Sequence, residues 1–233
     1  ITLSKEGSIF TVDDTPMRLS ILGLGHCANA LAAIATAQSL FISPGSCQNA
    51  LARLVSIPGR MERIDEGQPF TVLVDYAPEP ASLRHLYETI ALIPHKRVIH
   101  VLGSAGGGRD VARRSVLGDI AARHANVVIV TNEDPYDDPP MTIIRDVADG
   151  ARHAYENDSS VPMKELLRIE DRTQALRTAL RRAQPDDIVL ATGKGCEQAI
   201  CVAHGRTIPW DERTVLRTLL RELNSESSSN ASL

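Results

Sequence analysis

A glycine-rich segment, GSAGGGRD at residues 103–110, follows the apolar run RVIHVL and precedes a helix-like stretch. Successive backbone N–H groups in such a turn can form a concave anion-binding surface. Arg109 could add a fork of N–H donors to a carboxylate or a phosphate. The segment lacks the Lys-Ser/Thr of a phosphate-binding P-loop, and a tight strand-to-helix turn with Arg109 paired to a surface acid explains it equally well.

Two further polar segments follow apolar runs. TNEDPYDDPP, at residues 131–140, contains Asp134 and Asp137, which could hold an ammonium group, although a solvated turn braced by prolines is the simpler interpretation of this segment alone. GKGCEQ, at residues 193–198, combines glycines with the opposite charges of Lys194 and Glu197; the alternative is a glycine turn with a surface lysine. The histidines are isolated, so we expect no metal site.

The segments that must position these loops alternate between strand-like and helix-like patterns. Short apolar runs predict strands over 70–76, 97–103, 126–132, 165–170 and 187–193. Helical spacing of apolar residues predicts helices over 79–92, 111–125, 140–156, 171–183 (capped by Asp171) and 211–223. This alternation predicts an α/β fold with a mostly parallel sheet and helices on both faces. The polar residues after the strands, Asp75 included, should therefore share one sheet edge.

The remaining segments are less regular. We expect a hairpin in 1–12, a strand over 17–23, and helices over 27–42 and 46–57, the second capped by Ser46. Residues 199–210 should form a hairpin around His204 and Gly205, and the polar residues 224–233 a disordered tail. Because the chain opens at Ile1 inside a strand-like pattern, we expect further residues upstream.

Composition excludes several classes of protein. The 233 residues carry a net charge of −4 with acids and bases interspersed, which argues against a nucleic-acid partner. The four cysteines (Cys27, Cys47, Cys196 and Cys201) are scattered, which indicates free thiols in a reducing cytoplasm. We find no apolar run of membrane-spanning length and no signal-peptide pattern, so we expect a cytoplasmic protein without a membrane partner.

Eight segments in sequence order resemble motifs of the Mur ligase family. They are NALAAIATA, IPGRME, VDYAPEPASL, GSAGGGRD, VVIVTNEDP, DRTQALRTAL, IVLATGKG and PWDER. The likeness covers nearly the whole chain and points to the branch that adds the third residue of the peptidoglycan stem peptide. It implies an ATP-dependent amide ligase of cell-wall synthesis that acts on UDP-MurNAc-L-Ala-D-Glu and a diamino acid, with ATP and Mg²⁺ as cofactors. In this family ATP phosphorylates the substrate carboxylate, and the incoming amine attacks the acyl phosphate.

The resemblance also implies a domain organisation. Residues 1–66 would be the end of the central ATPase domain, 67–223 a C-terminal Rossmann-like domain that binds the incoming amino acid, and 224–233 the tail. The family's Gly-Lys-Thr phosphate loop, modified lysine and magnesium-binding acids have no counterpart in these 233 residues. We therefore expect this chain by itself to be an inactive monomer, with no catalytic residue and no metal ligand of its own.

Individual residues inherit roles from the same resemblance. Asn29 would lie by the adenine of ATP, and Arg60 and Asp75 by the ribose. Arg109 would bind the α-carboxylate of the incoming diamino acid and Glu197 an amino group. The matched substrate-binding positions are Arg109, Asp134, Tyr136, Gly193 and Glu197.

The chain departs from the family where substrate is selected. Members specific for meso-diaminopimelate usually show Asp-Asn-Pro-Arg, whereas this chain has Glu133-Asp134-Pro135-Tyr136. Tyr136 thus replaces the arginine that would clamp the distal carboxylate, and the acids around it favour lysine or ornithine, although Arg113 or Arg114 could reach in from the next helix.

Other departures from the family motifs are Pro78, Val111 and Cys196. They leave two alternatives open. One is another superfamily enzyme, such as a folylpolyglutamate or cyanophycin synthetase. The other is a binding module without catalysis.

Overall fold

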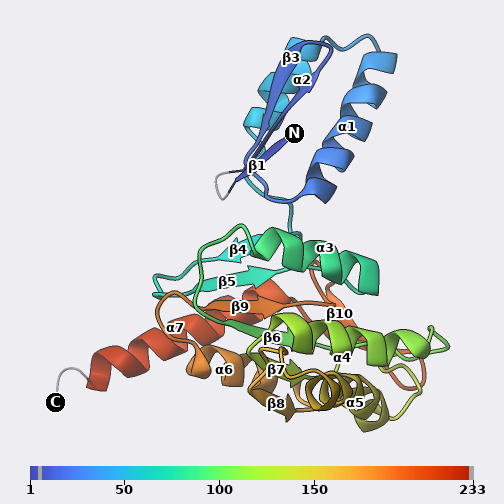
Figure 1. Cartoon of the computed structure of the whole chain (residues 1–233), viewed down its shortest axis with the longest axis vertical. Coiled ribbons are helices and arrows are strands. Elements are labelled where there is room, and N and C mark those ends of the chain that lie inside the picture. The colour runs from blue at the N-terminus through green and yellow to red at the C-terminus, as the bar shows by residue number, and fades with distance from the viewer. Residues whose placement is uncertain (5–6, 231–233) are drawn as a thin grey trace. The chain divides into compact units, whose positions relative to one another are not determined.

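The computed structural model describes residues 1–4 and 7–230, and their contacts divide the chain into two compact units (Figure 1). The first unit comprises residues 1–57 and 84–94, and the second comprises 58–83 and 95–233. This division falls earlier in the chain than the boundary expected at residues 66 and 67. The reason is that the short strand of residues 62–64 joins the sheet of the second unit.

The first unit combines a small antiparallel sheet with two helices. Its elements are β1 (Thr2–Ser4), β2 (Gly7–Val12), β3 (Thr15–Leu19), α1 (Leu24–Ser39) and α2 (Pro44–Ala52). The strands pair in the order β1-β2-β3, which confirms the hairpin at the start of the chain. Phe10, Met17, Cys27 and Ile34 belong to the buried core that joins sheet and helices.

The predicted N-cap of α2 is wrong. Ser43, not Ser46, caps this helix: its Oγ accepts a hydrogen bond from the Ser46 backbone N–H at 3.2 Å. Pro44 occupies the first helical position, where its fixed φ suits a helix and its missing N–H is not needed. The helix therefore starts one residue after Ser43, earlier than apolar spacing alone indicated.

The second unit is built on a six-stranded sheet. Its strands are β4 (Glu62–Ile64), β5 (Thr71–Val74), β6 (Val98–Leu102), β7 (Val127–Val130), β8 (Glu165–Arg168) and β9 (Ile188–Ala191). They lie in the order β4-β5-β9-β6-β7-β8; β4 is antiparallel to β5, and all other pairs are parallel. Every residue of β6, β7 and β9 is buried, which explains why these strands read as continuous apolar runs. The short strand β4 was not predicted from the sequence.

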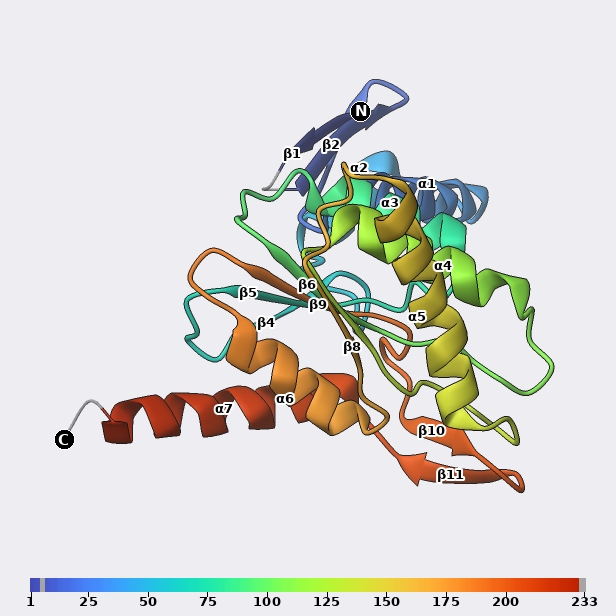
Figure 2. The same cartoon turned by 60° about the horizontal axis from the view of Figure 1, so that its bottom comes forward.

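Helices cover both faces of this sheet. They are α4 (Ala112–His124), α5 (Pro140–Asn157), α6 (Arg172–Arg182) and α7 (Glu212–Asn230), whereas α3 (Pro80–Ile90) begins in the second unit and belongs from Arg84 onward to the first. The helices α4 and α5 lie on one face, and α6 and α7 lie on the other (Figure 2). The predicted α/β fold with a mostly parallel sheet is therefore confirmed, as are Asp171 as the cap of α6 and the hairpin of β10 (Ala199–Val202) and β11 (Arg206–Pro209).

The C-terminal helix extends beyond its expected end. The structure continues α7 to Asn230, where the sequence predicted a disordered tail from residue 224; residues 231–233 lie outside the described part of the chain. Side-chain contacts hold this extension: Asn224 Nδ2 donates to the Glu66 carbonyl at 2.8 Å, and Glu226 pairs with Arg181 of α6 at 2.9 Å. Among the described residues, no helix is both long and apolar enough to cross a membrane.

Candidate functional site

Four polar loops meet at the carboxyl edge of the six-stranded sheet, as the sequence predicted. They follow β5, β6, β7 and β9, which run parallel with β9 between β5 and β6. The loop after β9, residues 192–198, consequently lies centrally. In open α/β sheets this edge, near a change in strand order, is where ligands bind.

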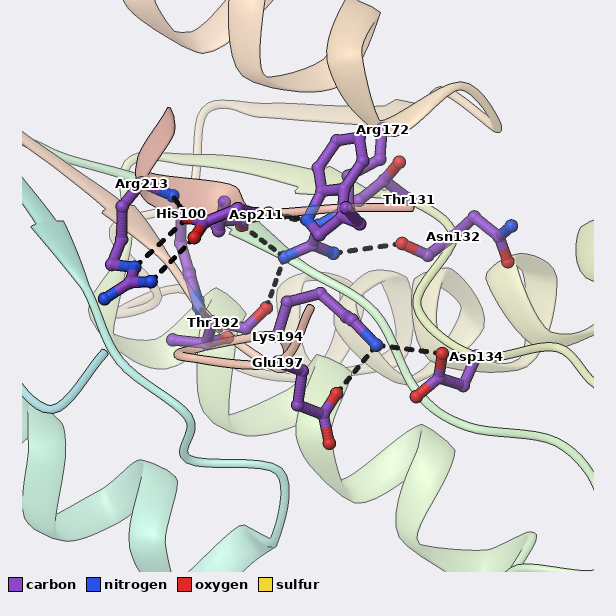
Figure 3. Close-up of polar contacts among 12 residues, drawn as sticks. His100, Thr131, Asn132, Asp134, Arg172, Thr192, Lys194, Glu197, Asp211 and Arg213 are labelled. Atoms are coloured by element: carbon purple, nitrogen blue, oxygen red, sulfur yellow. Dashed lines mark hydrogen bonds and ion pairs between the residues drawn. The ribbon is translucent and has the colours of Figure 1, made fainter. Parts of the chain in front are cut away.

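Lys194 joins two of these loops through a buried ion pair (Figure 3). Its Nζ lies 2.8 Å from Asp134 Oδ1 and 2.7 Å from Glu197 Oε2, and the residue has 0% relative exposure. Burial disfavours the ammonium, but the bonds to Asp134 and Glu197 outweigh it, so the pKa of Lys194 is raised. The alternative of a surface lysine is therefore wrong. The two acids expected to bind a substrate amino group are bridged by an ammonium of the chain itself.

Asp134 and Tyr136 are fixed mainly through the backbone. Asp134 Oδ1 also accepts from the Cys201 N–H at 2.7 Å, and the Tyr136 N–H donates to the Cys201 carbonyl at 3.1 Å. The pKa of the Tyr136 phenol is raised, chiefly by a hydrogen bond with the Cys201 thiol, while a hydrogen bond with Arg109 acts in the opposite direction. A Cβ on Gly107, at φ +64°, would lie 2.7 Å from the Tyr136 ring, so the glycine-rich loop can pack here only with a glycine.

Glu133 and Gly193 form a second close contact between the loops after β7 and β9. Glu133 is 4% exposed, and burial raises the pKa of its carboxyl to about 7 in spite of Arg172 and Lys194 nearby. Gly193 has φ +100°, and a Cβ there would lie 2.2 Å from Glu133 Oε2. Gly193 is thus required by the approach of Glu133, a residue that was not predicted from the sequence to belong to the site.

Arg60 and Asp75, the two residues expected near the ribose, lie together in the second unit. The Arg60 guanidinium carbon lies 4.5 Å from the centre of the Tyr76 ring. Asp75 accepts from the N–H groups of Met61 at 2.7 Å and Ala77 at 3.0 Å, and burial raises its pKa against these bonds. Each Asp75 oxygen keeps a further lone pair, so a hydroxyl donor fits this carboxylate. Asn29, expected at the adenine, is exposed on α1 in the first unit.

Arg113 and Arg114 do not supply a free cation. Both are buried at the start of α4. Arg113 binds Glu79 and, at 3.4 Å, the Ser104 hydroxyl. Arg114 pairs with Asp138 at 3.0 Å and with Asp146 at 2.9 Å. Arg109, in contrast, is exposed beside Tyr136.

A deeper set of polar groups, which no sequence pattern indicated, supports these loops. Arg172 at the start of α6 pairs with Glu212 at the start of α7, at 2.6 Å, and both side chains are almost fully buried. His100 Nε2 lies 2.9 Å from Thr192 Oγ1; burial, and then the charge of Arg172, lower the pKa of His100 to about 3, so that it is neutral. Among the described residues, no group of three or more His, Cys, Asp or Glu side chains could hold a metal ion.

Two relatives are similar in sequence to most of this chain. A UDP-N-acetylmuramyl-tripeptide synthetase of Roseiflexus sp. (strain RS-1) is 42% identical over 207 residues, 88% of this chain and 39% of the relative. A UDP-N-acetylmuramoyl-L-alanyl-D-glutamate–2,6-diaminopimelate ligase of Corynebacterium efficiens (strain DSM 44549) is 38% identical over 214 residues, 91% of this chain and 40% of the relative. This chain therefore spans about two fifths of the length of these relatives.

A solved structure and a family model extend the comparison. The structure of a UDP-N-acetylmuramoyl-L-alanyl-D-glutamate–2,6-diaminopimelate ligase superposes with a TM-score of 0.65 at 26% identity, over 95% of this chain and 44% of that one. The family model described as Mur ligase, glutamate ligase domain matches residues 59–195, which contain the loops after β5, β6 and β7 and the start of the loop after β9. The chain belongs to the Mur ligase family.

Proposed function

We propose that this chain is the part of an ATP-dependent ligase that binds the incoming amino acid, the third residue added to UDP-MurNAc-L-Ala-D-Glu. The observation that carries the proposal is the convergence, at one sheet edge, of an exposed cation, Arg109, and two carboxylates, Asp134 and Glu197. An amino acid presents a carboxylate and an ammonium group, and this edge offers partners for both. The names of the relatives support the reaction.

Arg109 is proposed to bind the α-carboxylate, and Glu197 an amino group. Arg109 is exposed, so its fork of donors is accessible to a ligand. About 35% of the Glu197 side chain is also exposed, and Glu197 therefore keeps accessible acceptor capacity beside Lys194. Lys194 and Cys201 both bind Oδ1 of Asp134, so we assign this oxygen to holding the loops in place, while Oδ2 keeps acceptor capacity. Gly193 lets the loop after β9 approach, and Tyr136 borders the site next to Arg109.

The preferred substrate is proposed to be a diamino acid with one carboxylate, lysine or ornithine. A distal carboxylate requires a cationic partner, since an unpaired charge in a desolvated site is costly. Tyr136 stands where diaminopimelate-specific members usually carry arginine, and Arg113 and Arg114 already bind acids of this chain. The name of the Corynebacterium relative refers to diaminopimelate. The proposal therefore implies that the two proteins differ in substrate, and it attributes the difference to the residue at position 136.

ATP is proposed to contact this chain through Asn29, Arg60 and Asp75, with Asp75 accepting a ribose hydroxyl. In the complete enzyme ATP and Mg²⁺ supply activation of the substrate carboxylate, while residues of this chain orient the amine that attacks it. No Gly-Lys-Thr/Ser segment is present in the 233 residues. We propose that the chain acts in the cytoplasm and that alone, as a monomer, it releases no phosphate from ATP when amino acid is added. A phosphate-release assay tests this last point.

Calorimetric titration of the 233-residue chain with lysine, ornithine, meso-diaminopimelate and alanine tests the proposal. We expect lysine or ornithine to bind more tightly than meso-diaminopimelate, and alanine to bind weakly. The variant Glu197→Gln should lose affinity for the diamino acids, whereas Glu222→Gln on α7 serves as a control remote in sequence. Tighter binding of meso-diaminopimelate would contradict the proposed substrate, and absence of binding by all four compounds would contradict the proposed function.

A further inference from the structure

The loops after β7 and β9 are not joined by strand pairing. The sheet order is β9-β6-β7, so β6 separates the two strands whose loops carry Asp134 on one side and Lys194 and Glu197 on the other. Something beyond the sheet must therefore set the spacing of these loops. The Lys194–Asp134 pair links the two loops near the surface of the site. Deeper in the molecule, one guanidinium group contacts both loops.

Arg172, the first residue of α6, makes this deeper connection (Figure 3). Its Nη1 donates to the Asn132 carbonyl, in the loop after β7, at 3.0 Å. Its Nη2 donates to the Thr192 carbonyl, in the loop after β9, at 2.7 Å. The guanidinium thus spans the end of β6 and binds the backbone of both loops, two residues before Asp134 and two before Lys194.

Glu212, the first residue of α7, fixes the guanidinium in this orientation. Its carboxylate accepts from Arg172 Nε at 2.9 Å and Nη2 at 2.6 Å, and from Trp210 Nε1 at 2.9 Å. The side chains of Arg172 and Glu212 are 1% and 0% exposed. A buried ion pair holds its geometry only when its hydrogen bonds are satisfied, and a rigid planar fork bonded on three sides has little freedom to reorient.

The position of Arg172 is unfavourable for the helix itself. A cation in the first turn of a helix opposes the positive end of the helix dipole, which commonly disfavours it. Burial of the guanidinium opposes its charge as well. The contacts that compensate for both are Glu212 and the two loop carbonyls. This arrangement connects the candidate site rather than stabilising α6.

We propose that Arg172 is a positioning residue, which, held by Glu212, sets the spacing of the loops after β7 and β9 and thereby of the groups that bind the incoming amino acid. The effect on amino-acid binding rests on the proposed function, whereas the coupling of the two loops does not. Helix α7, through its first residue, thereby has a role in shaping the substrate site.

Hydrogen–deuterium exchange of the 233-residue chain tests the coupling in the variants Arg172→Lys and Glu212→Gln. Lysine keeps the charge, but its donors all lie on one nitrogen and cannot reproduce the planar fork of Nε, Nη1 and Nη2 that reaches Glu212 and both loops. We expect the amides of residues 131–138 and 192–198 to exchange about tenfold faster in both variants, since bonds to a charged group are lost. The exchange rates of the amides in strand β5 should be unchanged. The control Arg177→Lys, on the same helix with an exposed partner in Glu222, should leave both loops as they are.

The outcome for the two loops decides the proposal. Faster exchange in both loops, with β5 unaffected, supports it; faster exchange in one loop or in neither overturns it, and so does a uniform increase that includes β5. If Arg172→Lys does not fold, Glu212→Gln decides by the same criteria. Calorimetry then tests the link to function. A variant that folds but shows faster exchange in both loops should bind lysine or ornithine at least about tenfold more weakly than the unaltered chain does. If the unaltered chain binds no amino acid, the proposed function fails, while the exchange result still stands.

Discussion

The ammonium of Lys194 lies 2.8 Å from the carboxylate of Asp134, with 1% of the lysine side chain and 11% of the aspartate side chain exposed. The pair connects the loop after β9 to the loop after β7. Since removing one partner of a buried pair leaves the other charge without compensation, this contact should matter to stability far more than a surface pair does.

Replacement of Lys194 by methionine should therefore destabilise the chain by about 3–5 kcal/mol, because Asp134 would remain buried without its cation. The matched control is Lys96→Met. Lys96 pairs with Asp186 at 3.0 Å, but both side chains are about two-thirds exposed, so the expected loss is at most about 1 kcal/mol. Urea unfolding of the three proteins measures the difference. Equal losses for the two variants would show that the Lys194 pair contributes no more than a surface contact.

Glu133 should make stability depend on pH. Its pKa is raised from 4.5 to about 7 by burial, so the folded chain holds the proton more tightly than the unfolded chain does. The resulting stabilisation is complete below about pH 4.5 and is lost as the pH rises through about 7. Glu133→Gln, which cannot ionise, should gain stability relative to the unaltered chain between about pH 5 and pH 8, by about 3 kcal/mol.

Chemical unfolding at about pH 5 and about pH 8 checks this difference, with Glu222→Gln as the control for loss of an exposed carboxylate. The free energy of unfolding of the control should equal that of the unaltered chain at both pH values. If the free energies of unfolding of Glu133→Gln and the unaltered chain differ by the same amount at both pH values, the raised pKa of Glu133 is contradicted.

Gly150 should not tolerate a side chain. A Cβ at this position of α5 would lie 2.0 Å from the Ser115 carbonyl oxygen of α4, so Gly150→Ala must push the two helices apart. We expect a loss of at least about 2 kcal/mol, from overpacking against backbone. Gly45→Ala in α2 is the matched control, because a Cβ there meets no atom within 4 Å. Thermal unfolding distinguishes them; comparable midpoints would mean that the helix crossing adapts.

Arg109→Lys should weaken amino-acid binding without affecting stability. Lysine keeps the charge but loses the bidentate contact with a carboxylate, and a charge-assisted hydrogen bond contributes about 1.5–3 kcal/mol. Calorimetry with lysine or ornithine should therefore show a roughly tenfold or greater loss of affinity. Arg152→Lys on α5, an exposed residue paired with Asp149, is the control. Unchanged affinity in Arg109→Lys would assign Arg109 to the loop structure alone.

The sequence was sufficient for most of the second unit's architecture. Continuous apolar runs identified the buried strands β5, β6, β7 and β9, and helical spacing identified the helices between them, because both patterns are local. The parallel arrangement followed from their alternation, and with it the meeting of four loops at one edge. The short strand β4 was missed, since three residues give too little pattern, and the cap of α2 was misassigned because Ser43 and Ser46 both fit a cap by type.

The polar interior of the site was decided by tertiary structure. Lys194 lies in a glycine turn and Arg172 at a helix start, and neither pattern predicts burial. Their burial depends on Asp134 and Glu212, which lie far away in sequence. The pKa of Glu133 likewise depends on its enclosure by Gly193 and neighbouring loops. Local pattern reports which residue types occur, whereas burial and pairing arise only when the sheet order brings β7 and β9 to either side of β6. For that reason the sequence by itself identified the loops, and only the fold determined which of their charges face a ligand and which hold the loops together.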